Sequence, residues 1–154
     1  MTTLIVRSRV AILLLVQLLL PLSAPAETCK PTEPDALGPF YTAGAPRRLS
    51  VGAGYILTGV VRSAKDCAPI HQATIEFWLA GPDGRYDDDH RATVVTDEKG
   101  SYRFESNSPP AYYGRPPHIH LRVSARGFET LVTQQYPEQG SSEGNFDVVL
   151  VPGN

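Results

Sequence analysis

The stretch Ala73-Thr74-Ile75-Glu76-Phe77-Trp78-Leu79 decides the fold class. It alternates in the manner of a β-strand, in which successive side chains point to opposite faces. One face carries Ile75, Phe77 and Leu79, and the other carries Glu76 and Trp78. Directly after it, Gly81-Pro82-Asp83-Gly84 is a strong turn signal. The stretch therefore predicts a β-strand that ends in a tight turn.

Short runs of β-type sequence recur along the chain at close intervals. They cover residues 55–61, 73–79, 91–96, 101–104, 118–123, 130–136 and 146–151. Turns rich in Gly and Pro separate many of these runs, and the sequence contains no helical period of useful length. This pattern predicts an all-β fold, a single-domain β-sandwich over residues 51–154.

The first 26 residues have the features of a secretory signal peptide. Arg7 and Arg9 precede an apolar run over residues 10–22, and Ala24-Pro25-Ala26 fits the small-residue cleavage pattern. The run is too short and wrongly flanked for a stable membrane span. We therefore expect cleavage near Ala26, a mature form without a membrane segment, and export to the periplasm or out of the cell. A Pro-rich arm over residues 27–50 would then precede the sandwich domain.

Charge and cysteine content narrow the possible partners and the compartment. The expected mature chain has a net charge of about −4, because the first 26 residues remove two arginines from a total of 14 basic and 16 acidic side chains. This mild acidity argues against a nucleic-acid partner, which needs clustered positive charge. An oxidising compartment favours pairing of the two cysteines. We predict a Cys29–Cys67 disulfide that ties the arm to the turn at residues 65–69. The sequence leaves the oligomeric state open.

The stretch Tyr112-Tyr113-Gly114-Arg115-Pro116-Pro117-His118-Ile119-His120 carries the chemistry. On a β-strand, His118 and His120 emerge on the same side, while Ile119 faces the core. Two neutral imidazoles on one face can hold a transition metal, although such a pair is also typical of a solvated face. Ferric iron gains from anionic phenolate donors, whereas structural zinc prefers Cys and His. The nearby tyrosines therefore favour Fe(III) over Zn(II).

Five segments taken in order resemble the intradiol ring-cleavage dioxygenases, the family of protocatechuate and catechol dioxygenases. They are Leu37-Gly38-Pro39-Phe40-Tyr41, Phe77-Trp78 through Gly84-Arg85-Tyr86, Thr96-Asp97 through Phe104, Arg115 through His120, and Leu131-Val132-Thr133-Gln134. Each segment is weak alone, but the ordered set is specific and spans nearly the whole expected mature chain. The resemblance implies a β-sandwich that holds one non-haem Fe(III) ion through two tyrosines and two histidines.

The resemblance also implies which residues form the site. The implied iron ligands are Tyr86, Tyr112, His118 and His120. Tyr112 aligns with the family's Pro-Gly-x-Tyr pattern through Pro109-Pro110-Ala111-Tyr112, but the adjacent Tyr113 stays open as the alternative. The active-site arginine of the family matches Arg115, and its glutamine matches Gln134. Tyr112 is expected to leave the iron and accept a proton from the substrate.

The function implied is oxidative ring cleavage of a catechol-type compound with O2, giving a muconate-type diacid. Five residues separate Tyr112 from His118 and nine separate Tyr86 from Thr96, both fewer than in the larger relatives. We therefore expect a shallow, open pocket that admits bulky or polyphenolic catechols as well as simple ones.

Two other functions remain open at this point. A secreted β-sandwich binding module would keep the scaffold and bind no metal. A zinc hydrolase would use His118 and His120, but the sequence shows no third ligand at a recognisable spacing.

Overall fold

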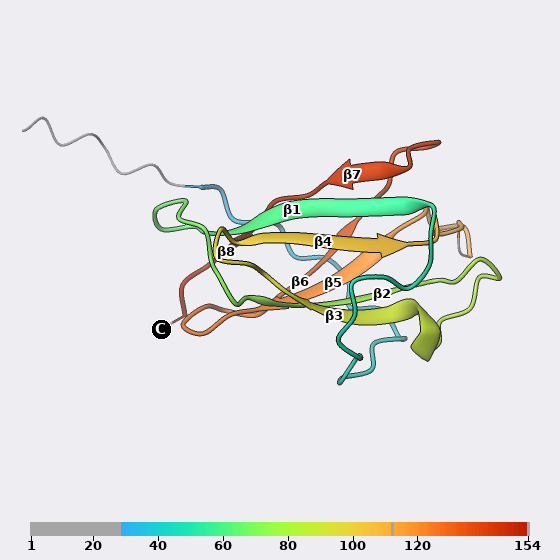
Figure 1. Ribbon diagram of the computed structural model, residues 1–154, viewed down its shortest axis with the longest axis horizontal. Coiled ribbons are helices and arrows are strands. Elements are labelled where there is room, and N and C mark those ends of the chain that lie inside the picture. The colour runs from blue at the N-terminus through green and yellow to red at the C-terminus, as the bar shows by residue number, and fades with distance from the viewer. Residues whose placement is uncertain (1–28, 112, 154) are drawn as a thin grey trace, which may run out of the picture.

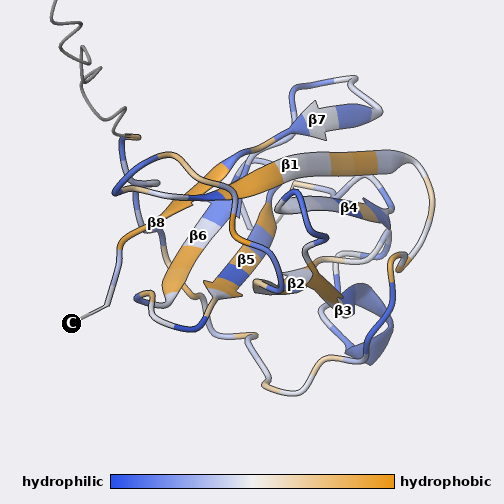
Figure 2. Ribbon diagram, turned by 60° about the vertical axis from the view of Figure 1, so that its left-hand side comes forward, coloured by the Kyte–Doolittle hydropathy of each residue, from blue (hydrophilic) through white to orange (hydrophobic). Residues whose placement is uncertain are grey.

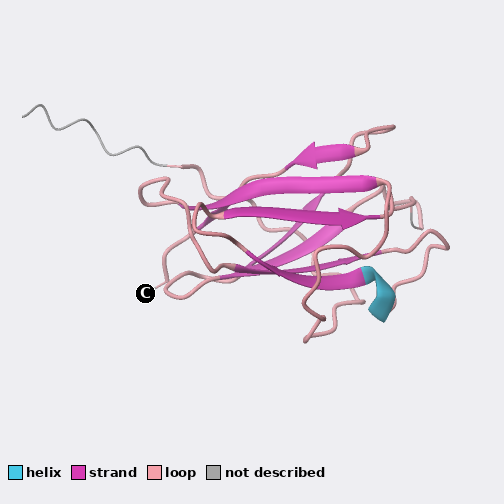
Figure 3. Cartoon of the chain, in the orientation of Figure 1, coloured by secondary structure: helices cyan, strands magenta, loops and turns pink. Residues whose placement is uncertain are grey.

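The computed structural model describes residues 29–111 and 113–153 as two β-sheets packed face to face (Figures 1 and 3). The elements are β1 (Tyr55–Ser63), β2 (Thr74–Leu79), the 3-10 helix η1 (Asp88–His90), β3 (Arg91–Val95), β4 (Ser101–Ser106), β5 (Ile119–Ser124), β6 (Leu131–Gln135), β7 (Glu143–Asn145) and β8 (Val148–Leu150). The expected signal peptide over residues 1–26, the start of the expected arm and the expected ligand Tyr112 lie outside the described residues. In the part of the chain that is described, no helix is long and apolar enough to cross a membrane.

The two sheets have simple topologies. The first has the order β4-β1-β7, and β8 also pairs with β1. β1 runs antiparallel to β4 and parallel to β7 and β8. The second sheet has the order β3-β2-β5-β6, and all of its pairs are antiparallel. The predicted all-β sandwich is therefore confirmed.

The core lies between the sheets and follows from the alternation in the sequence. Apolar residues of β1, β2, β4 and β5 point inward and are almost fully buried, and Figure 2 shows the hydrophobic stretches on β1, β6 and β8. The rings of Phe77 and Phe104 stack across the sandwich, with centroids 4.2 Å apart and planes 2° from parallel. Burial of one such side chain stabilises the fold by about 1.5–3 kcal/mol.

The outer face of the second sheet is covered as well. β2 is buried along most of its length, including Glu76 and Trp78 on the face away from the core. The arm over residues 29–50 covers this face, and its backbone is hydrogen-bonded to β6 through Asp35 and to β3 through Pro46. In Figure 1 the arm passes from the left-hand end of the sandwich towards the right. A site on this face is therefore walled by the arm.

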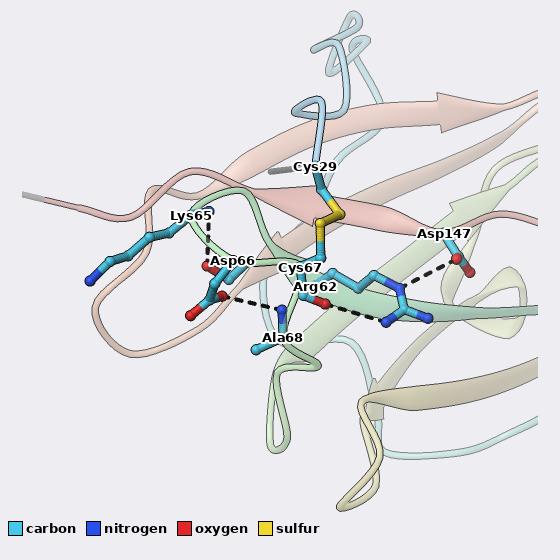
Figure 4. Close-up of a disulfide and its surroundings, with 8 residues drawn as sticks. Cys29, Arg62, Lys65, Asp66, Cys67, Ala68 and Asp147 are labelled. Atoms are coloured by element: carbon cyan, nitrogen blue, oxygen red, sulfur yellow. Dashed lines mark hydrogen bonds and ion pairs between the residues drawn. A yellow bond between two sulfur atoms is a disulfide. The ribbon is translucent and has the colours of Figure 1, made fainter. Parts of the chain in front are cut away.

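The predicted disulfide between Cys29 and Cys67 is confirmed (Figure 4). The two Cα atoms are 5.2 Å apart, within the usual range for a bridge. The Cys67 amide also donates to the Ser63 carbonyl at 2.9 Å, which closes the turn after β1. The bridge fixes the described start of the arm at one end of the sandwich. This is the end at which β2 begins, where Thr74 pairs with Ser124, whereas His120 pairs with Trp78 near the other end of β2.

Two local features differ from the expectations. β7 (Glu143–Asn145) has no apolar alternation and is hydrophilic in Figure 2, so the sequence does not mark it; its pairing with β1 makes it a strand. His90 lies outside the segments that carry the resemblance, so a surface position is expected for it, but its side chain is only 17% exposed and its Nδ1 lies 2.7 Å from the carboxylate of Asp87. Its ring packs over Gly81, where an added Cβ would come within 2.5 Å of it.

Candidate metal centre

The register of the second sheet places the histidines beneath the arm. His120 on β5 pairs with Trp78 on β2 and with Gln134 on β6. Because Ile119 points into the core, His120 points to the outer face, and His118 precedes the strand on that same side. The two imidazole rings lie 4.8 Å apart at 79° and are almost fully buried. The pair is therefore covered by protein and does not form a solvated face.

Tyr86 reaches the histidines from the connection between β2 and β3. Its hydroxyl oxygen lies 3.2 Å from Nε2 of His118. The other nitrogen of that ring, Nδ1, lies 2.8 Å from the Pro116 carbonyl. A carbonyl only accepts, so Nδ1 carries the proton and Nε2 presents a lone pair to Tyr86. Two donor atoms bound to one metal ion at roughly 2 Å each lie roughly 3 Å apart, which this pair matches.

The protonation state of the histidines also suits a metal. Burial lowers the pKa of His118, and the positive charge of Arg115 adds to the effect. Burial, the adjacent His118 and Arg115 lower the pKa of His120 to about 4. Both rings are therefore neutral at pH 7, as metal ligation requires. The buried Nδ1 of His120 makes no hydrogen bond of good geometry within the described residues, and the nearby Ala36 carbonyl only partly offsets the lowering of the pKa of this ring.

Arg115 stands beside the histidines in a network of polar groups. Its Nη1 lies 3.4 Å from Nε2 of His118, and its Nη2 donates to Oε1 of Gln134 at 2.7 Å. The amide of Gln134 donates to the Ala36 carbonyl at 2.6 Å, which links the network to the arm. The Tyr136 hydroxyl accepts from Arg115 at 3.3 Å and donates to the carboxylate of Asp35 at 2.8 Å. These contacts hold a permanent cation in a fixed place.

A second layer of side chains supports His120. The indole of Trp78 stacks on its ring with centroids 4.8 Å apart and planes 5° from parallel. Tyr41 of the arm packs on the indole at 5.0 Å and donates to Oε2 of Glu76 at 3.0 Å. The same oxygen accepts from Arg122 at 2.7 Å. This partly buried ion pair therefore anchors the arm over the site.

The histidines, Tyr86 and Arg115 border a pocket of ≈ 300 Å³. It is lined by Gly38, Pro39, Phe40, Tyr86, Tyr113, Arg115, His118 and His120. The structure thus brings four of the expected site residues close together, namely Tyr86, Arg115, His118 and His120. Gln134 contacts this group through its hydrogen bond with Arg115. Tyr112 lies outside the described residues, and Tyr113 lines the pocket with 89% of its surface exposed. Within residues 29–111 and 113–153, no three His, Cys, Asp or Glu side chains could hold a metal ion together.

The arm forms one wall of the pocket, and the sequence alone does not predict this role for it. Phe40 stacks on Tyr86 with ring centroids 4.4 Å apart. Gly38 lies so close to His120 that an added Cβ would be 3.2 Å from its Cε1, and its φ of +72° favours glycine. The available signal is the segment Leu37-Gly38-Pro39-Phe40-Tyr41, which carries part of the resemblance but has no β or helical period. The sequence gives no sign that Trp78 lies against His120.

Comparison with known proteins identifies the family. A family model described as dioxygenase matches residues 42–142, more than half of the sequence. The chain belongs to the intradiol dioxygenase family. Chlorocatechol 1,2-dioxygenase of Pseudomonas sp. (strain P51) is 29% identical over 149 residues, which cover 75% of this chain and 59% of that protein. Hydroxyquinol 1,2-dioxygenase of Nocardioides simplex is 34% identical over 140 residues, which cover 70% of this chain and 47% of that protein. The chain therefore spans about half to three-fifths of the length of these relatives.

Solved intradiol dioxygenase structures have the same fold. The dioxygenase domain of a dioxygenase–carbohydrate-binding protein fusion from Streptomyces sp. SirexAA-E is similar with a TM-score of 0.73 and 27% identity, over 80% of this chain and all of that one. Chlorocatechol 1,2-dioxygenase from Pseudomonas putida is similar with a TM-score of 0.67 and 25% identity, over 77% of this chain and 71% of that one. The whole of the Streptomyces domain therefore aligns with this intradiol dioxygenase chain.

Proposed function

We propose that this protein is a non-haem, Fe(III)-dependent intradiol dioxygenase that cleaves the ring of catechol-type compounds with O2 and forms muconate-type diacids. The observation that carries the proposal is the approach of the Tyr86 hydroxyl oxygen to Nε2 of His118 at 3.2 Å, beside the buried His120 and the fixed cation Arg115. The two relatives named above by sequence act on chlorocatechol and hydroxyquinol, according to their names.

The side chains proposed to hold the iron are Tyr86, Tyr112, His118 and His120. Tyr113 is the alternative to Tyr112, because it is adjacent in sequence and lines the pocket. A phenol–imidazole donor set suits a hard trivalent ion. When bound, ferric iron would bind the catechol through its oxygens, withdraw electron density from the ring and make the ring reactive towards O2.

The protein groups around the pocket have separate roles in this proposal. Arg115 would stabilise the negative charge that develops on the substrate, because its guanidinium is a permanent cation fixed by Gln134. Tyr112 would take one proton from a catechol hydroxyl at its phenolate oxygen. Gly38, Phe40 and the rest of the arm would cover His120 and exclude water from that side of the ring.

Colour and iron content test the proposal. We expect one iron per chain, a reddish-brown colour from ferric tyrosinate, and O2 uptake when catechol is added. Tyr86→Phe should shift or bleach the colour and abolish uptake, because it removes one phenolate ligand. Tyr41→Phe is the matched control, since Tyr41 packs on Trp78 in the second layer and its hydroxyl faces Glu76. A colourless protein that binds no metal would refute the proposal and leave the secreted binding module as the function.

Export is a separate part of the proposal. We propose that residues 1–26 are removed near Ala26 and that the mature protein acts in the periplasm or outside the cell. The Cys29–Cys67 disulfide supports this, because such bridges persist in oxidising compartments. N-terminal sequencing of the protein from its native host should find a mature chain that begins near Glu27. An intact leader on a cytoplasmic protein would contradict the proposal.

A further inference from the structure

A second hollow adjoins the pocket of the proposed metal centre. This outer hollow has a volume of ≈ 550 Å³ and is lined by Phe40, Asp83, Gly84, Arg85, Tyr86, Ala111 and Tyr113. Phe40, Tyr86 and Tyr113 line both spaces. The two spaces therefore adjoin each other at these three side chains, and we call the two together the groove.

We propose that the outer hollow binds an aryl substituent of the substrate, so that the preferred substrates are catechols that carry a second, uncharged aromatic ring. This inference rests on the proposed function, because the catechol end of such a molecule has to be held at the metal centre. A substituent on the catechol ring that points away from the histidines and towards Phe40 and Tyr113 would enter the outer hollow.

The rim of the groove offers aromatic surface to such a ring. Tyr113 is 89% exposed and Phe40 is 39% exposed, and both are among the large hydrophobic side chains that stand out from the surface. Phe40 also stacks on Tyr86, so one of its faces is backed by protein. Offset-stacked or edge-to-face contacts with another ring contribute about 0.5–1.5 kcal/mol beyond the burial of area. A flat aromatic substituent therefore suits this part of the groove.

The backbone holds Tyr113 in an unusual position. Its φ is +43°, a left-handed conformation that is uncommon for a residue with a side chain, and Gly114 follows with φ +77°. Such a conformation costs a non-glycine residue roughly 1 kcal/mol, and residues of this kind cluster at ligand sites. The strain places the ring at the rim of the groove and away from the core.

The outer hollow offers no net charge to an acidic substituent. Among its lining residues, only Asp83 and Arg85 are charged, and their side chains pair with each other at 2.7 Å. Because the carboxylate already occupies the guanidinium, the hollow has no net positive charge to attract a substrate carboxylate. A neutral ring with hydroxyl groups could instead form hydrogen bonds to the polar edges of this pair.

O2 uptake with two matched substrates tests the inference. We expect the purified iron protein to show a higher kcat/KM for 4-phenylcatechol than for 4-methylcatechol. Tyr113→Ala should reduce that preference about tenfold, which corresponds to about 1.4 kcal/mol. Equal kcat/KM values for both substrates, or an equal loss on both in the variant, would overturn the inference while the proposed function stands. If neither substrate is consumed, the proposed function fails and the inference fails with it.

Two control variants separate the ring of Tyr113 from its hydroxyl and from general surface effects. Because Tyr113 is also the alternative iron ligand, Tyr113→Phe decides between the two roles: if the ring acts as a wall of the groove, both the preference and the visible colour are kept. Loss of both would show that the hydroxyl acts on the iron, which would overturn the proposed role of the ring. Leu49→Ala removes another exposed apolar side chain, 61% exposed and outside the lining of the groove, and should change nothing.

A binding measurement completes the test. Anaerobic titration of the iron protein, followed by its visible absorption, gives the Kd of each catechol without turnover. We expect a lower Kd for 4-phenylcatechol than for 4-methylcatechol in the wild type, and a smaller difference in Tyr113→Ala. Identical Kd values for the two catechols in the wild type would overturn the inference.

Discussion

Removal of the Cys29–Cys67 disulfide should destabilise the domain by an amount that the structure sets. The bridge closes a loop with a sequence separation of 38 residues. A cross-link lowers the loop-closure entropy of the unfolded chain, and for a loop of this length the chain-entropy model gives about 4 kcal/mol at 25 °C. Replacement of both cysteines, Cys29→Ser with Cys67→Ser, should therefore reduce the free energy of unfolding by about 4 kcal/mol.

Urea denaturation measures this loss. For a domain of this size, with an m-value of about 1–3 kcal/mol/M, the midpoint should fall by roughly 2 M. Wild-type protein kept in reductant should behave like the double variant, and the double variant should not respond to reductant. A loss below about 1 kcal/mol would refute the reasoning. It would mean that the first residues of the arm contribute little to the cooperative unit, although they are hydrogen-bonded to β8 through Thr32.

Three further predictions concern the site and the arm. Gln134→Leu removes the acceptor that fixes Arg115, and a hydrogen bond to a charged group contributes about 1.5–3 kcal/mol; kcat/KM for catechol should fall about 10- to 100-fold while the thermal midpoint stays close to that of the wild type, and unchanged kcat/KM would contradict the role of Gln134. Glu76→Gln removes the charged partner of the partly exposed Arg122 and weakens the contact to Tyr41. The free energy of unfolding should therefore fall by about 1–3 kcal/mol. A thermal midpoint within 1 °C of the wild type would show that the pair does not anchor the arm. Burial acts to raise the pKa of Asp35, but hydrogen bonds from the Ala36 amide and from Tyr136 outweigh it and lower the pKa below 3.8. A carboxyl group whose pKa is lowered by folding stabilises the folded state at pH values above its pKa in the unfolded chain. The difference in unfolding free energy between wild type and Asp35→Asn should therefore be present at pH 6 and disappear as the pH falls below about 3.8. A difference that stays constant over this range would show that ionisation of Asp35 does not contribute to stability.

The strands of the core follow directly from the sequence. In β2 and β5 every second residue is apolar and buried between the sheets, and in β1 every second residue is buried, so the period of two predicts both the strand and its inner face. β7 could not be predicted in this way, because Glu143, Gly144 and Asn145 carry no apolar pattern. Its strand geometry comes from pairing with Ile56, Leu57 and Thr58 of β1, a segment distant in the chain.

The candidate site was predictable residue by residue but not as an arrangement. His118 and His120 share a face because of the strand period, and Arg115 lies just before them in the same segment. Tyr86 lies 32 residues before His118, and no local pattern indicates that the two meet. The second layer, with Trp78 stacked on His120 and Tyr41 on Trp78, depends on the register of β2 against β5 and on the path of the arm.

The sequence by itself determined the strand pattern, the pairing of the two cysteines, and the types of donor atom available for a metal. These are local or compositional properties, since they depend on side-chain period, residue type and compartment. Only the tertiary structure decided that the arm lies across the outer face of β2 and β5, and that Tyr86, His118 and Arg115 meet beneath it. The physical reason is that these contacts depend on sheet register and on hydrogen bonds between segments far apart in the chain, neither of which leaves a periodic signal in the sequence.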